Sequence, residues 1–142
     1  SQNSIGIGIF QNSNTVVINE KELRNFLSNS KEKLDILSII FFKKVKCKIL
    51  VVTSGKSGST LYRANKSMKI TCPAFGNKII DKTGSGDTFL CFFALMKAIE
   101  CSDAESLFVA SIAAAESLKF IGNSNSISFE KLKFALESFI NW

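Results

Sequence analysis

The sequence has 142 residues, of which 46% are hydrophobic and 21% charged, a balance typical of one folded domain and not of a disordered chain. No apolar run reaches the ~18 residues of a membrane span, so the sequence predicts no membrane partner. The net charge of +6 comes from lysines scattered along the chain, and the lack of a basic block argues against a nucleic-acid partner.

The cysteine pattern points to an intracellular chain. The four cysteines show no CxxC spacing and the sequence has no histidine, which leaves only a scattered four-cysteine set for a structural zinc. Reduced and mostly buried thiols are the simpler interpretation. Because no signal peptide is visible, we expect a cytoplasmic protein.

Strands and helices alternate in the first half of the chain. Short strands are predicted at IGIGIF and TVVIN, and a helix from Asn19, because Leu23, Phe26 and Leu27 have helical spacing. The segment KEKLDILSIIFFKKVKC predicts an apolar helix that leads into the strand ILVVT, which ends at Thr53. This strand lacks polar alternation, a pattern typical of burial on both faces.

The second half begins with short β segments and continues with helices. STLYR, MKITC and NKII predict a hairpin or meander, and DTFLCFFALMKAI, which follows Gly86, predicts a buried helix because it is long and uniformly apolar. Ser102 and Glu105 have capping-box spacing at the start of the next helix, which continues through VASIAAAESL. After the loop GNSNS, a closing amphipathic helix is predicted, with an apolar face formed by Phe129, Leu132, Leu136 and Ile140.

The segment DKTGSGDTF carries the strongest functional signal. A β segment enters a glycine turn that becomes the N-terminus of a helix, and the amides of Gly84, Ser85 and Gly86 can therefore point at a bound anion. Asp87 follows directly. A carboxylate beside an anion pocket can take a proton from a hydroxyl, but an acidic residue in a first helical turn also stabilises the helix dipole. Position alone does not separate these two interpretations.

This segment resembles the D-T-x-G-A-G-D-x-F signature of the ribokinase-like (phosphofructokinase B) carbohydrate kinases. The resemblance implies that Asp87 is the catalytic base toward a sugar hydroxyl and that Gly84, Ser85 and Gly86 form the anion hole. It also implies that Asp81 and Thr83 help to hold a monovalent cation, K⁺ in the simplest case.

Two upstream segments match the same family in the same order. TSGKSG resembles its T-x-G-x-x-G turn, which implies nucleotide contacts for Thr53, Gly55 and Gly58, although an ordinary hairpin connection has the same composition. NEKE resembles its N-x-x-E motif, which implies that Asn19 and Glu22 act near Mg²⁺ and the phosphates, Glu22 through water. The alternative for NEKE is a helix cap.

Downstream, VASIAAAESL resembles the family's small-residue helix and glycine loop. The resemblance implies adenine contacts for Ala110, Ser111 and Ala114, and a cation loop that includes Gly122 and Ser126. A small-residue helix is also what close packing alone requires.

The resemblance covers nearly the whole chain, yet only the C-terminal half of such a kinase, whose N-terminal half binds the acceptor. SQNS ahead of NEKELR further resembles the branch that phosphorylates heptose phosphates. Cys91 and Phe92 depart from the family pattern, because small residues are usual at both positions. The departures leave open a catalytically degenerate nucleotide-binding or assembly module derived from such a kinase.

Together these patterns predict one domain over residues 1–142 with an α/β, ribokinase-like fold, a mostly parallel sheet flanked by helices. The expected function is phosphotransfer from Mg²⁺-ATP to a hydroxyl of a sugar or sugar phosphate. The acceptor-binding half is expected on a missing segment or a partner chain, so this chain alone should be inactive. A homodimer is left open.

Overall fold

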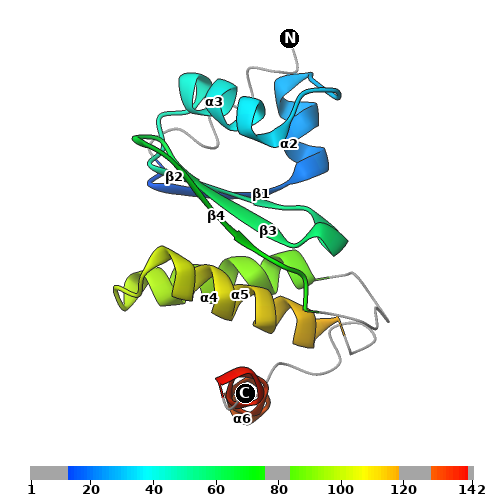
Figure 1. Ribbon diagram of the computed structural model, residues 1–142, viewed down its shortest axis with the longest axis vertical. Helices are drawn as coiled ribbons and strands as arrows, with labels where there is room; N and C mark the ends of the chain where they lie inside the picture. Colours follow the sequence, from blue (N-terminus) through cyan, green and yellow to red (C-terminus); the bar gives the residue numbers. More distant parts are fainter. Residues whose placement is uncertain (1–12, 76–83, 119–128, 141–142) are drawn as a thin grey trace. The chain divides into compact units, whose positions relative to one another are not determined.

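A computed structural model describes residues 13–75, 84–118 and 129–140 of the chain (Figure 1). The chain divides into two compact units. Unit 1 comprises Ser1–Ser54 and Thr60–Thr71, and unit 2 comprises Gly55–Ser59 and Cys72–Trp142. The chain therefore passes from one unit to the other three times, at residues 54–55, 59–60 and 71–72.

The sheet of unit 1 has four strands in the order β1-β2-β3-β4. The strands are β1 (Thr15–Asn19), β2 (Ile49–Thr53), β3 (Ser59–Arg63) and β4 (Lys66–Cys72). β1 and β2 are parallel, as expected. The connections before and after β3 are too short for a crossover, so β3 and β4 continue the sheet as the expected hairpin. The sheet of the described residues is thus mixed, whereas the sequence predicts a mostly parallel one, because the hairpin adds two strands without a crossover.

The crossover from β1 to β2 consists of two helices, α2 (Glu20–Leu27) and α3 (Leu34–Lys44), which lie on one face of the sheet (Figure 1). Leu23, Leu37 and Phe41 of these helices are fully buried. The predicted strand ILVVT is confirmed as β2, and its first four residues are all buried, as the lack of polar alternation predicts. The core of unit 1 also includes Val16, Ile18, Leu50 and Val52.

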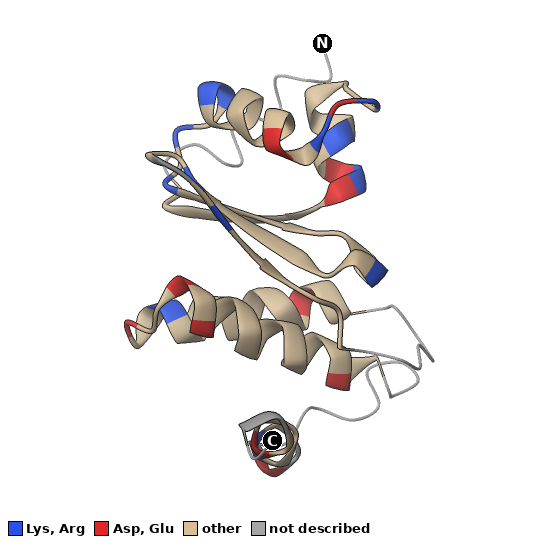
Figure 2. Ribbon diagram, viewed as in Figure 1, with Lys and Arg blue, Asp and Glu red and all other residues tan. Residues whose placement is uncertain are grey.

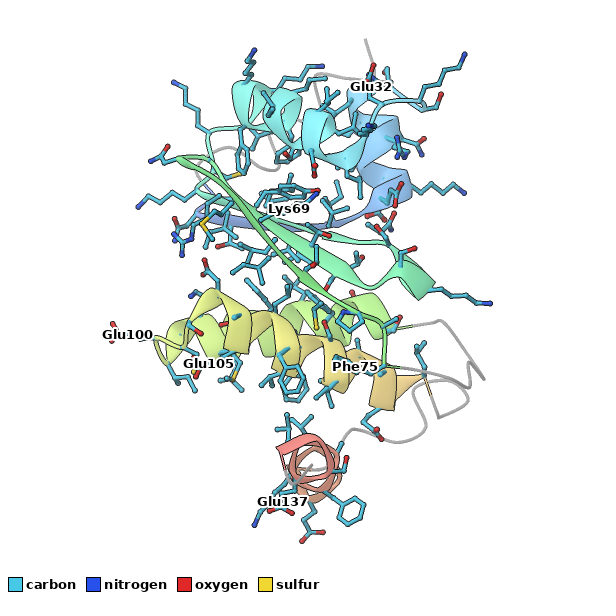
Figure 3. All side chains as sticks on the ribbon, viewed as in Figure 1. Glu32, Lys69, Phe75, Glu100, Glu105 and Glu137 are labelled. Atoms are coloured by element: carbon cyan, nitrogen blue, oxygen red, sulfur yellow. The ribbon has the colours of Figure 1, made fainter. Side chains whose placement is uncertain are left out.

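A polar contact joins α3 to the hairpin within unit 1. The Asp35 carboxylate accepts from Lys69 Nζ at 2.7 Å and from the Tyr62 hydroxyl at 3.0 Å (Figure 3 labels Lys69). Lys69, followed by Tyr62, holds the pKa of Asp35 below its ordinary value. The carboxylate therefore stays charged and keeps both donors at neutral pH.

Unit 2 contains a 3₁₀ turn, η1 (Gly55–Ser57), and the helices α4 (Ser85–Ala98), α5 (Asp103–Ser117) and α6 (Phe129–Ile140). The predicted capping box of α5 is confirmed: the Ser102 hydroxyl accepts from Glu105 N at 3.2 Å, and Glu105 Oε2 accepts from Ser102 N at 2.9 Å. Phe75, labelled in Figure 3, packs edge-on against Phe108 of α5 with ring centroids 5.5 Å apart. α5 and α6 share a buried cluster of Ile112, Ala113, Leu132 and Ala135.

The prediction that the helix after Gly86 is buried is wrong for one face of α4, because Phe89 and Phe93 are buried whereas Leu90 and Leu95 are about half exposed. The apolar composition of the α4 segment does not show which face of the helix is buried against other residues. The predicted strands IGIGIF and NKII and the loop GNSNS lie outside the described residues. No helix in the described ranges is long and apolar enough to cross a membrane.

Candidate functional site

The N-terminus of α4 consists of Gly84, Ser85 and Gly86. Gly84, its N-cap, has the left-handed conformation at φ 83°, and no side chain caps the helix. Gly86 is exposed, and a β-carbon placed on it would meet no heavy atom of the described residues within 4 Å. The amides of a first helical turn have no intrahelical acceptor, and the helix dipole places partial positive charge beside them. This end of α4 therefore suits an anion such as a phosphate group.

Asp87 is the third residue of α4 and is exposed. Its carboxylate stands in the first turn, at the same helix end as Gly84, Ser85 and Gly86. The position fits both sequence interpretations, since a first-turn carboxylate stabilises the dipole and also provides a proton acceptor beside an anion.

The two glycines of the turn after β2 have different surroundings within unit 2. Gly58 has φ 84°, and a β-carbon there would stand 2.1 Å from the Cys72 carbonyl oxygen. Gly55 has φ 55°, but its β-carbon position faces open space. Close backbone packing therefore requires a glycine at position 58. At Gly55 there is room for another molecule.

The predicted adenine-contact residues of α5 are largely buried. Ala110 is fully buried, Ala114 is partly buried, and the buried Ser111 hydroxyl lies 3.1 Å from the Ser59 hydroxyl. Burial raises the pKa of the nearby Cys72 thiol, while a hydrogen bond with Ser111 works in the opposite direction. In the described structure Ser111 thus holds together segments of unit 2, and its contact with adenine stays a prediction.

In unit 1, Asn19 and Thr53 end adjacent parallel strands and are direct partners in the β1–β2 register. The capping alternative for Asn19 is realised: its Oδ1 accepts from Glu22 N at 2.8 Å, and Glu22 Oε2 accepts from Asn19 N at 3.2 Å. Asn19 and Glu22 are both exposed. The carboxyl ends of parallel strands are where open α/β sheets bind ligands. The structure thus brings two sequence-predicted residues, from two motifs, to one such place.

Glu20 was missed by sequence reasoning, which concentrated on Glu22 of the N-x-x-E pattern. The Glu20 carboxylate accepts from Arg24 Nη2 at 2.7 Å and from Arg24 Nε at 3.0 Å. A hydrogen bond from the Ser54 side chain, followed by Arg24, lowers its pKa. The available signal was the i,i+4 spacing of Glu20 and Arg24. This contact ties the first turn of α2 to the segment that follows β2.

The residues predicted to hold a monovalent cation are Asp81, Thr83, Gly122 and Ser126. All four lie outside the described residues. Within the part of the chain that the structure describes, no group of three or more His, Cys, Asp or Glu side chains could hold a metal ion. The K⁺ site therefore stays a prediction.

A family profile and several solved structures match this chain. The sequence matches the profile of the pfkB family carbohydrate kinases over residues 9–129. A comparison with curated protein sequences gives no match. Ribokinase from Thermotoga maritima is similar in structure, with a TM-score of 0.80 and 26% identity over 92% of this chain and 44% of its own.

Two further solved structures are similar. Arabidopsis thaliana ribokinase, solved with ribose and ATP, has a TM-score of 0.78 and 25% identity over 87% of this chain and 41% of its own. A putative ribokinase II from E. coli, solved with ATP and Mg²⁺, has a TM-score of 0.80 and 16% identity over 95% of this chain and 42% of its own.

These similarities establish the fold and the family. The fold is α/β and ribokinase-like, as the sequence predicts, and the chain spans less than half the length of these three solved structures. The family profile covers most of the chain, including every described segment that carries a predicted site residue. The chain belongs to the pfkB family of carbohydrate kinases.

Proposed function

We propose that the chain is the nucleotide-binding and catalytic part of an ATP-dependent kinase that phosphorylates a hydroxyl of a sugar or sugar phosphate. The observation that carries this proposal is the glycine turn at the N-terminus of α4, with its left-handed Gly84 and exposed Gly86. Asp87 supplies an exposed carboxylate in the same turn. An anion site and a proton acceptor are the two elements that phosphotransfer to an alcohol needs.

The roles of these residues follow from their chemistry. MgATP, when bound, supplies the transferable γ-phosphoryl group, and a related ribokinase was solved with ATP. The amides of Gly84, Ser85 and Gly86 stabilise the negative charge of that group, because they are fixed donors at the positive end of α4. Asp87 takes the proton of the acceptor hydroxyl. At the same time the hydroxyl oxygen bonds to the γ-phosphorus, and the bond between that phosphorus and the departing ADP breaks.

In unit 1, the ends of β1 and β2 contribute to nucleotide binding in this proposal. Thr53 and Asn19 lie side by side at a strand end that suits a ligand. The capping box holds Glu22 at the same end, where its carboxylate acts on Mg²⁺ through water. Gly55 belongs to unit 2, where its open β-carbon position leaves room for close approach of a nucleotide.

The acceptor belongs to the whole kinase. The chain spans 44% of the Thermotoga ribokinase, and we infer that the acceptor pocket is formed by a part of the fold that this chain does not match. The heptose-phosphate assignment rests on SQNS and NEKELR and stays a prediction. We expect the isolated chain to lack phosphotransfer to free sugars, because a positioned acceptor supplies much of the rate.

Replacing Asp87 by asparagine tests the proposal in the protein that contains the acceptor pocket. Asp87→Asn keeps the size of the side chain but removes the proton acceptor, so kcat should fall by about 10²–10⁴ while ATP affinity barely changes. A residue that only stabilised the helix dipole would cost about 0.3–1 kcal/mol of unfolding free energy and leave turnover intact. Steady-state kinetics and urea denaturation of the same variant separate the two roles.

A titration of the isolated chain provides the control for the anion hole. We expect inorganic phosphate to shift the amide NMR signals of Gly84 and Gly86, whereas the signals of Ser102 and Asp103, at the capped start of α5, should stay in place. Unmoved glycine signals would contradict the anion hole. Nucleotide binding without phosphotransfer by the complete protein would instead indicate the catalytically degenerate module.

A further inference from the structure

Arg24 of α2 uses every nitrogen of its guanidinium group within unit 1. Nε and Nη2 donate to Glu20 Oε1, at 3.0 Å and 2.7 Å respectively. Nη1 donates to the carbonyl oxygen of Glu32 at 2.9 Å and to that of Ser30 at 3.3 Å. Figure 3 labels Glu32. One side chain thus joins the first turn of α2 to the connection between α2 and α3.

The connection that Arg24 reaches is itself held by hydrogen bonds. The Asn29 amide donates to the Arg24 carbonyl oxygen at 3.0 Å, and Asn29 Oδ1 accepts from Glu32 N at 3.2 Å. Main chain and side chain of Arg24 therefore bind the same connection. The two carbonyl oxygens that accept from the guanidinium group thus lie on an ordered segment, which fixes the position of that group.

A simple helix ion pair does not require this arrangement. α2 carries acidic and basic residues close together, as Figure 2 shows. On α6, Lys133 and Glu137 have the same spacing, but their charged atoms are 3.8 Å apart. A pair that only stabilises its helix needs one contact between its two members. Arg24 makes two contacts with Glu20 and binds two carbonyl oxygens as well, so helix stabilisation alone does not account for its geometry.

The other partner of Glu20 lies at the end of β2. Asn19 and Thr53 are register partners, and Glu20 and Ser54 are the residues that directly follow them. The Ser54 side chain forms a hydrogen bond with the Glu20 carboxylate. Ser54 is the last residue of unit 1 and the second residue of the TSGKSG turn. Arg24 and Ser54 therefore bind the same carboxylate, one from within α2 and one from the start of the turn.

We propose that Arg24 is a positioning residue for the nucleotide, which acts through Glu20 to fix Ser54 at the start of the TSGKSG turn. This inference rests on the proposed function, because it takes Thr53 and the turn as nucleotide contacts. Arg24 does not touch the nucleotide itself. Its guanidinium group anchors the carboxylate to the α2–α3 connection, and the carboxylate in turn holds the Ser54 side chain.

Two physical effects connect this contact to nucleotide affinity. A turn that is held in its bound position before binding loses less conformational freedom when the nucleotide binds. A carboxylate without a cation beside it would also repel the phosphate groups, and Arg24 offsets that charge. Lysine keeps the charge but lacks the planar fork of N–H donors, so Arg24→Lys separates positioning from charge.

The test is the MgATP affinity of the protein that contains the acceptor pocket, measured by calorimetric titration well below its melting temperature. Arg24→Lys should weaken binding by about tenfold, since the turn is then no longer held before binding. Arg24→Met should weaken it further, because Glu20 then keeps an uncompensated negative charge. The matched control is Lys69→Met, which breaks the ion pair with Asp35 in the same unit and should leave MgATP affinity at the parental value.

Ser54→Ala tests the far end of the same contact and leaves Arg24 and Glu20 paired. It should also weaken MgATP binding, and adding Arg24→Lys to it should weaken binding little further, because both changes release the same turn. If Arg24→Lys does not fold, Ser54→Ala alone decides, and parental affinity in that variant would refute the positioning role.

The other outcomes are distinct from one another. Parental MgATP affinity in Arg24→Lys would overturn the positioning role and leave the proposed function intact. Fully additive losses in the double variant would also overturn it, since they would show that Arg24 and Ser54 act separately. A loss of affinity in Lys69→Met equal to that in Arg24→Lys would reduce the effect to general destabilisation of unit 1. A parent protein that binds no MgATP would instead overturn the proposed function, and this inference with it.

Discussion

Gly55 and Gly58 of the TSGKSG turn should differ in how well they tolerate an added β-carbon. Gly58→Ala places a β-carbon 2.1 Å from the Cys72 carbonyl oxygen and keeps a positive φ, so we expect a loss of more than about 2 kcal/mol of unfolding free energy. Gly55→Ala meets open space and should lose only about 1 kcal/mol, from its left-handed backbone. Urea denaturation of both variants measures the difference. Equal losses would contradict the packing role of Gly58.

Glu20 should make stability depend on pH. Its folded-state pKa lies below the ordinary value of 4.5, mainly because of the Ser54 hydrogen bond and then Arg24. The stabilisation is therefore present above pH 4.5 and is lost as the pH falls through the folded-state pKa. Glu20→Gln should be less stable than the parent chain at neutral pH, and the gap in unfolding free energy should narrow in acid.

The partner of Glu20 supplies the control. Ser54→Ala removes the donating hydroxyl, so it should destabilise the parent chain more than it destabilises the Glu20→Gln chain. A gap between parent and Glu20→Gln that stays constant from neutral pH into acid would contradict the assigned contact.

At the scale of elements, the start of α2 combines a cap with a predicted binding role, and one substitution separates them. Asn19→Asp keeps an oxygen that accepts from Glu22 N but loses the amide and adds negative charge. We expect near-parental stability with nucleotide affinity lowered by about tenfold or more, since like charges repel. Calorimetric titration with MgATP and thermal melting measure the two effects.

The cap of α5 is the matched control for α2. Ser102→Ala removes a capping side chain of the same kind and should cost about 1 kcal/mol of unfolding free energy without changing nucleotide affinity. If Asn19→Asp binds MgATP as tightly as the parent chain does, the capping box is the whole function of Asn19.

Elements governed by local pattern were predictable, and contacts between distant residues were not. β2 and the capping box of α5 follow from spacing within a few residues, and both are confirmed. The Ser59–Ser111 contact joins residues 52 positions apart, so no local pattern encodes it. The exposed face of α4 escaped prediction because composition reports apolarity and not coverage. For the site, the motifs identified Asn19 and Thr53, whereas their alignment required the strand register.

For the whole molecule, the interleaving of the two units predicts cooperative unfolding. Two of the three passages between units fall inside β3 and β4, so neither unit can unfold without disturbing a strand of the sheet. Cys47 in unit 1 and Cys72 in unit 2 are both buried, and burial raises the pKa of each thiol. Pulsed thiol labelling across a urea gradient should therefore expose both at the same midpoint.

Cys91 provides the internal reference for that measurement. Its thiol is exposed and should be labelled at every urea concentration, before any unfolding occurs. Labelling of Cys72 at clearly lower urea than Cys47 would show that unit 2 opens by itself and would contradict a single transition.

The β1–β2 register also limits which mutations a lineage carrying this fold can accept. Asn19 faces Thr53 only because each strand has its present length up to that point. Substitutions in these strands leave that alignment intact, which is compatible with a TM-score of 0.80 at 26% identity. A single inserted or deleted codon within β1 would instead shift Asn19 past its partner and turn alternate side chains to the opposite face. Among related sequences, insertions should therefore occur in the connections between strands, while the strands themselves should differ by substitutions only.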